Sequence, residues 1–280
     1  MSKPANEPRE AVTPLPASTV LLLRDGAAGI EVFMVQRPTK MDFAAGALVF
    51  PGGKVDDADR AANVRPRCTG ADALDDFSLA LNVAAIRETF EECGVLLARP
   101  RGQSELVPLE RVPELETQYR DALVRDEVGI GDMADAEDLE LACDLLEYYA
   151  HWITPKIRPK RFDTHFFLAP APAGQSALHD GSESLDSLWS TPAQVMADYI
   201  GGIHLVMFPT YCNLLKLTKS NTVAEALDRA RRDEVVTVLG QHSIGTDGVR
   251  RLLLPKAAGY DITEMPDPTE PSGKRIVIQE

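Results

Sequence analysis

Three glutamates stand close together in one short segment of the chain. Glu88, Glu91 and Glu92 occupy positions i, i+3 and i+4, so on a helix their side chains project from one side. Three like charges at this spacing repel one another, and the macrodipole near a helix C-terminus disfavours them further. Carboxylate oxygens are the ligands that Mg²⁺ and Mn²⁺ prefer. The pattern indicates a divalent-cation site for a phosphate-containing substrate. The alternative interpretation is an acidic helix face that is exposed to solvent and binds nothing.

The segment from Leu79 to Cys93 is the clearest predicted helix. An acidic or hydroxyl side chain at position 75, 76 or 78 caps its start, and Gly94 follows its last residue, where a left-handed residue commonly ends a helix. Apolar residues recur at helical spacing on the side opposite the glutamates: Leu79, Val83, Ile86 and Phe90. We therefore expect one side of this helix to pack in the core and the other to present the glutamates.

Strand-like and helix-like segments alternate around this helix. A turn signal at Asp25-Gly26 separates apolar runs at 18–23 and 30–35, which predicts a β-hairpin. Further strands are expected at 48–50, 152–154, 162–168 and 188–189, with a closing pair at 235–239 and 249–254. Helices are expected at 113–128, 136–150, 209–217 and 222–232, and Thr191-Pro192 starts another. This order predicts an α/β fold, and the hairpin makes its sheet mixed.

Composition narrows the class of protein. The 280 residues include 43 acidic and 29 basic side chains, a net charge of −14, which argues against general binding to nucleic acid or anionic membranes. No apolar stretch approaches the ~18 residues that a membrane helix needs. The four cysteines form no C-x-x-C pair, so we expect reduced thiols in a cytoplasmic protein rather than a zinc or disulfide framework. The proline-rich residues 1–17 read as a disordered tail.

The segment from Arg87 to Val95 resembles the second half of the Nudix box, G-x5-E-x7-R-E-U-x-E-E-x-G-U, in which U is a bulky apolar residue. Gly53 matches the first glycine of the box. The chain departs from the pattern at three points: Asp59 replaces the first glutamate, 27 residues separate it from Arg87, and Thr89 replaces an apolar residue. An interrupted box of this kind is similar to the Nudix subgroup typified by the peroxisomal coenzyme A diphosphatase, the Nudix motif 19 type.

Further segments support the resemblance to this subgroup. They follow in the same order at 46–53, 87–100, 152–155, 161–168 and 189–192, so the resemblance covers roughly residues 18–200. The resemblance implies an α/β/α sandwich around a mixed sheet. We expect a single Nudix hydrolase domain over residues 18–280, with helical insertions at about 56–76 and 100–150.

The resemblance also implies roles for the box residues. Glu88, Glu91 and Glu92 would bind Mg²⁺ or Mn²⁺, which neutralises phosphate oxygens and activates the attacking water. Arg87 would orient a glutamate by ion pairing rather than contact the substrate. Gly53 would shape the turn before the helix. Since an insertion follows Asp59, we assign that residue no ligand role.

The general base and the substrate-binding residues lie outside the helix. Nudix enzymes take the base from the box or from a later loop, in which Glu183 is the best candidate, followed by Asp180 and Asp186. The substrate-binding candidates are Arg37, Gly52, Gly53 and Arg161. Arg37, Gly46 and residues 50–53 match the pattern of coenzyme A-cleaving Nudix proteins, but Asp42 stands where that pattern has a second arginine. Lys40 or Arg161 could replace it beside the 3′-phosphate of coenzyme A.

These residues lead to one main hypothesis and two alternatives. The main hypothesis is a metal-dependent pyrophosphohydrolase that cleaves coenzyme A or acyl-coenzyme A to 3′,5′-ADP and 4′-phosphopantetheine species. One alternative is hydrolysis of ADP-ribose, NADH or dinucleotide polyphosphates, and the other is a nucleotide-binding module without catalysis. The expected partner is a small-molecule nucleotide, with neither general nucleic-acid nor membrane binding, and a homodimer is expected by analogy alone. His151 and His165 border predicted strands, where a lone histidine is more often structural than catalytic.

Overall fold

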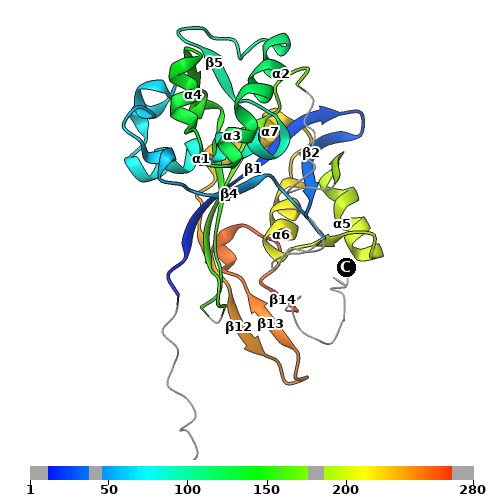
Figure 1. The fold of residues 1–280 in the computed structure, drawn as a ribbon. Coiled ribbons are helices and arrows are strands. Elements are labelled where there is room, and N and C mark those ends of the chain that lie inside the picture. The colour runs from blue at the N-terminus through cyan, green and yellow to red at the C-terminus, as the bar shows by residue number, and fades with distance from the viewer. Residues whose placement is uncertain (1–11, 38–45, 157, 176–185, 267–280) are drawn as a thin grey trace, which may run out of the picture.

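The computed structural model describes residues 12–37, 46–156, 158–175 and 186–266 of the chain (Figure 1). Strands β1 (Leu15–Gly26) and β2 (Gly29–Gln36) form an antiparallel hairpin in which Gly26 faces Gly29, as predicted. Strand β1 begins at Leu15, so the prediction of a tail through residue 17 is wrong for its last three residues. Their backbone pairs with another strand, β8 (Phe162–Pro170).

The central sheet has nine strands. Its order is β10-β3-β2-β1-β8-β7-β11, with β4 paired to β1 and β9 paired to β2. The remaining bounds are β3 (Ala47–Val49), β4 (Gly52–Lys54), β7 (Glu147–Ile153), β9 (Asp186–Ser190), β10 (Leu205–Val206) and β11 (Thr237–Leu239). Strands β1 and β8 are parallel, whereas β7 and β8 are antiparallel, so the sheet is mixed as expected. The parallel β1–β8 pair needs a long connection, and α1 lies within it.

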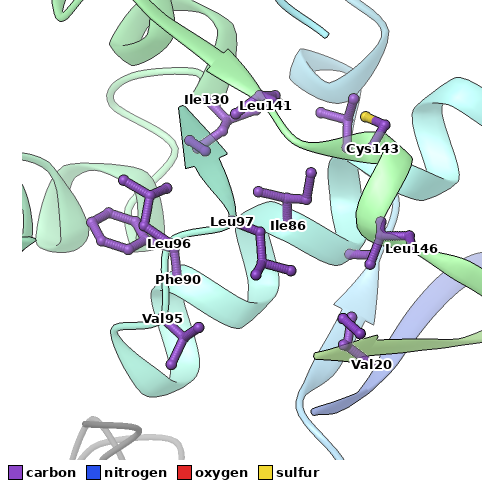
Figure 2. Close-up of a cluster of buried hydrophobic side chains, with 14 of the residues drawn as sticks. Val20, Ile86, Phe90, Val95, Leu96, Leu97, Ile130, Leu141, Cys143 and Leu146 are labelled. Atoms are coloured by element: carbon purple, nitrogen blue, oxygen red, sulfur yellow. The ribbon is translucent and has the colours of Figure 1, made fainter. Parts of the chain in front are cut away.

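Two hydrophobic cores cover the two faces of this sheet. Alternate residues of β1 point to opposite faces: Val20 and Leu22 belong to one core, and Leu21 and Leu23 to the other. Helix α1 (Asp76–Cys93) packs in the first core (Figure 2), where Ile86 and Phe90 are fully buried. Helices α5 (Pro192–Gly201), α6 (Phe208–Leu217) and α7 (Val223–Arg232) contribute to the second. The arrangement is the α/β/α sandwich that the resemblance implied.

The segment between α1 and β7 carries several short helices beside the first core. A helical course runs through α2 (Val112–Leu115), a π-helical stretch (Glu116–Arg120) and α3 (Asp121–Val124), so it starts one residue before the helix predicted at 113–128 and ends four residues before that prediction does. Helix α4 (Ile130–Ala136) follows it. Single 3-10 turns are also present at Ala58–Arg60, Arg65–Arg67, Ala71–Ala73, Leu109–Arg111, Cys143–Leu145 and Lys256–Ala258.

Two predictions of secondary structure are wrong. The segment 136–150 is not a helix: β6 (Leu139–Leu141) pairs with β5 (Ala98–Pro100), and β7 starts at Glu147. Asp138 adopts a left-handed φ of 50°, which a helix interior does not allow, and so the chain leaves the helical course there. The strands predicted at 235–239 and 249–254 form, but they do not pair with each other.

The last strands belong to two different sheets. Strand β11 pairs with β7 in the central sheet, whereas β13 (Arg250–Leu253) lies between β12 (Gln241–Ile244) and β14 (Glu264–Pro266) in a separate small sheet. This small sheet extends from one end of the molecule in Figure 1. Among the described residues, no helix is long and apolar enough to cross a membrane.

Candidate functional site

Helix α1 has well-formed caps at both ends. The Asp75 carboxylate accepts a hydrogen bond of 2.7 Å from the amide of Ser78, which satisfies one free N–H of the first turn. Gly94 ends the helix with φ of 67°, and its amide donates to Phe90 O at 2.9 Å. Near this end Arg120 Nε donates to the carbonyl of Glu91 at 2.7 Å, so a cation offsets the negative end of the helix dipole. The helix therefore holds its last two turns rigidly, and these turns carry the glutamates.

The three glutamates are buried rather than exposed. Glu88, Glu91 and Glu92 are 9%, 8% and 8% exposed, so the alternative of a solvated acidic face is wrong. The Gly52 amide donates to Glu92 Oε2 at 2.9 Å. A Cβ on Gly53 would lie 2.3 Å from Glu88 Oε1, so a side chain at this position would displace that carboxylate. Pairing of β4 with β1 thus presses the double-glycine strand against the carboxylates.

Arg87 lies at the centre of the acidic cluster. Its guanidinium donates from Nη1 to Glu88 Oε1 at 3.0 Å and to Glu91 Oε2 at 3.1 Å. On its other side it binds both oxygens of Asp59, from Nε at 2.9 Å and from Nη2 at 3.1 Å. Nη2 also donates to the backbone carbonyl of Lys54 at 2.8 Å. Arg87 therefore forms ion pairs with two glutamates through Nη1, and the ion pair with a glutamate is what the resemblance implied. Asp59 binds the Nε and Nη2 side of the same guanidinium.

The low polarity around these groups shifts their proton affinities. Burial raises the pKa of Glu88 to about 8, an effect that the charge of Arg87 opposes and that of Glu91 reinforces. Burial also raises the pKa of Glu91. Burial alone would lower the pKa of Arg87, but its hydrogen bond to Asp59 and the surrounding carboxylates raise it instead. A second positive charge beside these carboxylates would favour their ionised forms.

The glutamates line a pocket of about 450 Å³. Its walls come from several elements: Ala17, Thr19, Arg37, Gly52, Gly53, Lys54, Asp56, Arg87, Glu88, Glu91, Glu92, Leu123, Val124, Asp126, Lys160, Phe162 and Thr164. Carboxylates of α1 line the pocket together with the cations of Arg37, Lys54 and Lys160, and Leu123 and Val124 of α3 add apolar side chains. This volume suits a small-molecule ligand, and the mixture of cations and apolar side chains suits one that carries anionic and apolar parts.

Three of the four predicted substrate-binding residues line the pocket. Arg37, Gly52 and Gly53 line the pocket, but Arg161 does not. The Arg161 side chain is 6% exposed and donates to the backbone carbonyls of Thr154 at 2.9 Å and Val12 at 2.6 Å. Its role is to fasten the start of β8. The adjacent Lys160 lines the pocket instead.

Of the three loop candidates for the general base, only Asp186 belongs to the described residues. Glu183, Asp180 and also Lys40 lie outside the described residues. Asp186 begins β9, pairs with Gln36 and does not line the pocket. Sequence reasoning missed the apolar wall on α3, Leu123 and Val124. The only signal for that wall was the helical spacing of the segment.

The donor set of the pocket fits a hard divalent cation. Carboxylate oxygens from one helix face, with room for water and phosphate oxygens, are the ligands that Mg²⁺ and Mn²⁺ take. The carboxylate oxygens of the three glutamates do not all lie within 4.8 Å of one another. Among the described residues, only His151, Asp163 and His165 form such a group of candidate ligands. Arg87 holds Glu88 and Glu91, while Gly52 holds Glu92, so binding a cation requires these side chains to turn toward it.

Comparison with known protein families decides the classification. The sequence model described as the NUDT19 Nudix domain matches residues 64–217, more than half of the chain. The chain belongs to the NUDT19 Nudix domain family. The matched segment contains the whole of α1 with Arg87 and the three glutamates, and it ends with α6.

Curated relatives of this NUDT19 family member share modest identity with it. Acyl-coenzyme A diphosphatase NUDT19 of Xenopus laevis is 27% identical in an alignment of 219 positions, and the match covers 63% of this chain and 56% of that protein. The Homo sapiens protein of the same name is 27% identical in an alignment of 213 positions, and the match covers 62% of this chain and 56% of that protein. The chain thus spans little more than half the length of these relatives.

A solved structure extends the similarity to three dimensions. The crystal structure of a NUDIX hydrolase from Alicyclobacillus acidocaldarius superposes with a TM-score of 0.62 and 29% sequence identity. The match covers 77% of this chain and 96% of the other. The NUDT19-type domain therefore has the Nudix fold.

Proposed function

We propose that this protein is a diphosphatase, dependent on a divalent cation, that cleaves coenzyme A or acyl-coenzyme A. The products would be 3′,5′-ADP and 4′-phosphopantetheine or its acyl derivative. The observation that carries the proposal is the pocket lined by Glu88, Glu91 and Glu92, by the double-glycine strand β4 and by basic side chains. The names of the relatives support the substrate class.

The described residues suggest how the pocket would act on such a substrate. The cation, which we propose to be Mg²⁺ or Mn²⁺, supplies charge neutralisation at the diphosphate and activation of water when bound. Arg87 keeps Glu88 and Glu91 in place through direct ion pairs, and Asp59 keeps Arg87 in place. The backbone of Gly52 and Gly53 leaves room for the diphosphate to approach the helix. These groups position and neutralise, which is most of what phosphoryl transfer needs from a protein.

The basic side chains would recognise the nucleotide end of coenzyme A. Arg37 and Lys160 both line the pocket, so they replace Arg161 as candidates for the 3′-phosphate. Leu123 and Val124 provide an apolar surface for the pantetheine or acyl chain. The mixture of cations and apolar side chains favours coenzyme A over compact nucleotides that carry charge at both ends.

A product screen tests the proposal. The protein is incubated with coenzyme A, acyl-coenzyme A, ADP-ribose, NADH and diadenosine polyphosphates, first with Mg²⁺ and then with Mn²⁺, and products are identified by mass. We expect preferential cleavage of the coenzyme A compounds with release of 3′,5′-ADP. Preferential cleavage of ADP-ribose would reject the coenzyme A assignment, and absence of cleavage would reject hydrolysis.

A further inference from the structure

Two histidines and an aspartate converge at a place that the proposed function does not use. His151 on β7 lies directly opposite His165 on β8, and Asp163 stands two residues before His165, on the same face of β8. The imidazole rings of His151 and His165 stack, with their centroids 4.1 Å apart and an interplanar angle of 22°. None of the three lines the pocket described above. Phe162 and Thr164, which do line it, alternate with them along the strand.

Both imidazoles turn the same nitrogen toward one carboxylate. His151 Nε2 is hydrogen-bonded to Asp163 Oδ1, and His165 Nε2 lies 3.7 Å from the same oxygen. His165 is 8% exposed, and its Nε2 has no hydrogen-bond partner within the described part of the chain. A buried nitrogen that faces a carboxylate without a hydrogen bond leaves a ligand position unused.

The other nitrogen of each ring is held by a hydroxyl group. His151 Nδ1 and Thr237 Oγ1 share a hydrogen bond of 2.8 Å, and His165 Nδ1 and the Tyr148 hydroxyl share one of 2.9 Å. When Nδ1 carries the proton and a metal ion replaces the Nε2 proton that His151 donates to Asp163, the Nε2 atoms of both rings offer a lone pair to the ion. Outer hydrogen bonds of this kind orient the histidines of protein metal sites.

We propose that His151, Asp163 and His165 bind a divalent transition-metal ion of the Zn²⁺ class. Their candidate ligand atoms already lie within 4.8 Å of one another. A tetrahedral ion with bonds of about 2.0–2.1 Å brings its ligand atoms about 3.3 Å apart. The distance of 3.7 Å from His165 Nε2 to Asp163 Oδ1 is close to that value, so small side-chain rotations that unstack the rings complete the geometry.

The chemistry of the donors selects the ion. Two imidazole nitrogens and one carboxylate suit Zn²⁺, Co²⁺ or Ni²⁺, whereas Mg²⁺ prefers oxygen ligands throughout. The Asp163 side chain is 27% exposed, which leaves the fourth position open to water.

Such an ion would fasten one edge of the central sheet. The ligands come from β7 and β8, and Thr237 connects the site to the edge strand β11. Because such an ion binds the folded state and not the unfolded chain, its binding raises the thermal stability of the protein. This site is independent of the diphosphatase pocket, so the two proposals fail or succeed separately.

The test uses Co²⁺ as a spectroscopic probe. The 280-residue chain is treated with EDTA, dialysed, and saturated with Mg²⁺, so that the glutamate pocket is occupied before Co²⁺ is added. We expect visible d–d absorption that saturates at one equivalent, disappears when Zn²⁺ is added, and is accompanied by a rise in Tm of about 5 °C or more. Absence of the absorption and of any Zn²⁺-dependent rise in Tm would overturn the proposal.

Matched variants assign the metal to these residues. Asp163→Asn keeps the size of the side chain and should abolish the cobalt spectrum, while Tyr148→Phe should weaken binding about 10- to 100-fold because it removes only the outer hydrogen bond. Tyr148→Phe also serves as the test if Asp163→Asn fails to fold. His204→Gln, at a half-buried histidine outside the cluster, should leave the spectrum unchanged. A spectrum that survives in Asp163→Asn and Tyr148→Phe but is lost in Glu92→Gln would place the ion in the pocket and overturn the proposal.

Discussion

Replacement of Asp59 by asparagine tests how the box arginine is held in the core. Asp59 is 1% exposed, and both of its oxygens accept hydrogen bonds from Arg87. Asparagine keeps the size but removes the charge and turns one acceptor into a donor that faces the guanidinium. Breaking one partner of a buried ion pair costs about 3–5 kcal/mol. Because Glu88 and Glu91 still neutralise Arg87, we expect the lower value, about 3 kcal/mol.

This loss of stability is measurable by calorimetry. In a domain of this size each kcal/mol lowers Tm by about 2–4 °C, so Asp59→Asn should melt about 6–12 °C below the wild type. Scans in EDTA remove any contribution from bound metal. The matched control is Asp57→Asn, because the Asp57 side chain is fully exposed and water screens its ion pair with Arg60, 4.0 Å away. If the two variants melted together, the buried Asp59–Arg87 pair would not stabilise the fold and our reasoning would be refuted.

Three further predictions concern the end of α1 and the pocket. Gly94→Ala should lower stability by about 1–2 kcal/mol in chemical denaturation, because residue 94 has φ of 67° and a Cβ there would lie 1.9 Å from Glu116 Oε1. Gly53→Ala should lower kcat about 10- to 100-fold, because its Cβ displaces Glu88. For both, Gly201→Ala is the control, since a Cβ there meets nothing within 4 Å. Lys160→Ala should raise KM for coenzyme A about tenfold but leave KM for dephospho-coenzyme A unchanged. The control Lys156→Ala, at an exposed site, should change neither KM. Equal effects of Lys160→Ala on both substrates would rule out a 3′-phosphate contact.

The local features of the site were predictable from sequence. The caps and periodicity of α1 determine its ends and place Glu88, Glu91 and Glu92 together, because each of these signals depends on residues within one or two turns. The hairpin of β1 and β2 and the starts of α5 and α7 follow from turn and capping residues in the same way. Such features depend on neighbours in the chain.

The long-range features were not predictable. Asp59 and Arg87 are 28 positions apart, and no periodicity connects them across the intervening turns. Lys160 and Arg161 are adjacent cations, so only the path of the chain into β8 decides which faces the pocket. The segment 136–150 has apolar residues at helical spacing, but β-sheet pairing with β5 and β8 outweighs that weak preference.

The rate of coenzyme A hydrolysis by Glu92→Gln tests the central claim most directly. Glutamine keeps the size of the side chain and its contact with the Gly52 amide, but it removes the charge proposed to hold the cation. With saturating Mg²⁺ we expect kcat to fall at least about 100-fold, since a cation at the diphosphate contributes several kcal/mol to the transition state. Glu105→Gln, at an exposed glutamate outside the pocket, should keep the wild-type rate. A Glu92→Gln protein that hydrolyses coenzyme A as fast as Glu105→Gln would contradict the assignment of this pocket as the metal-dependent active site.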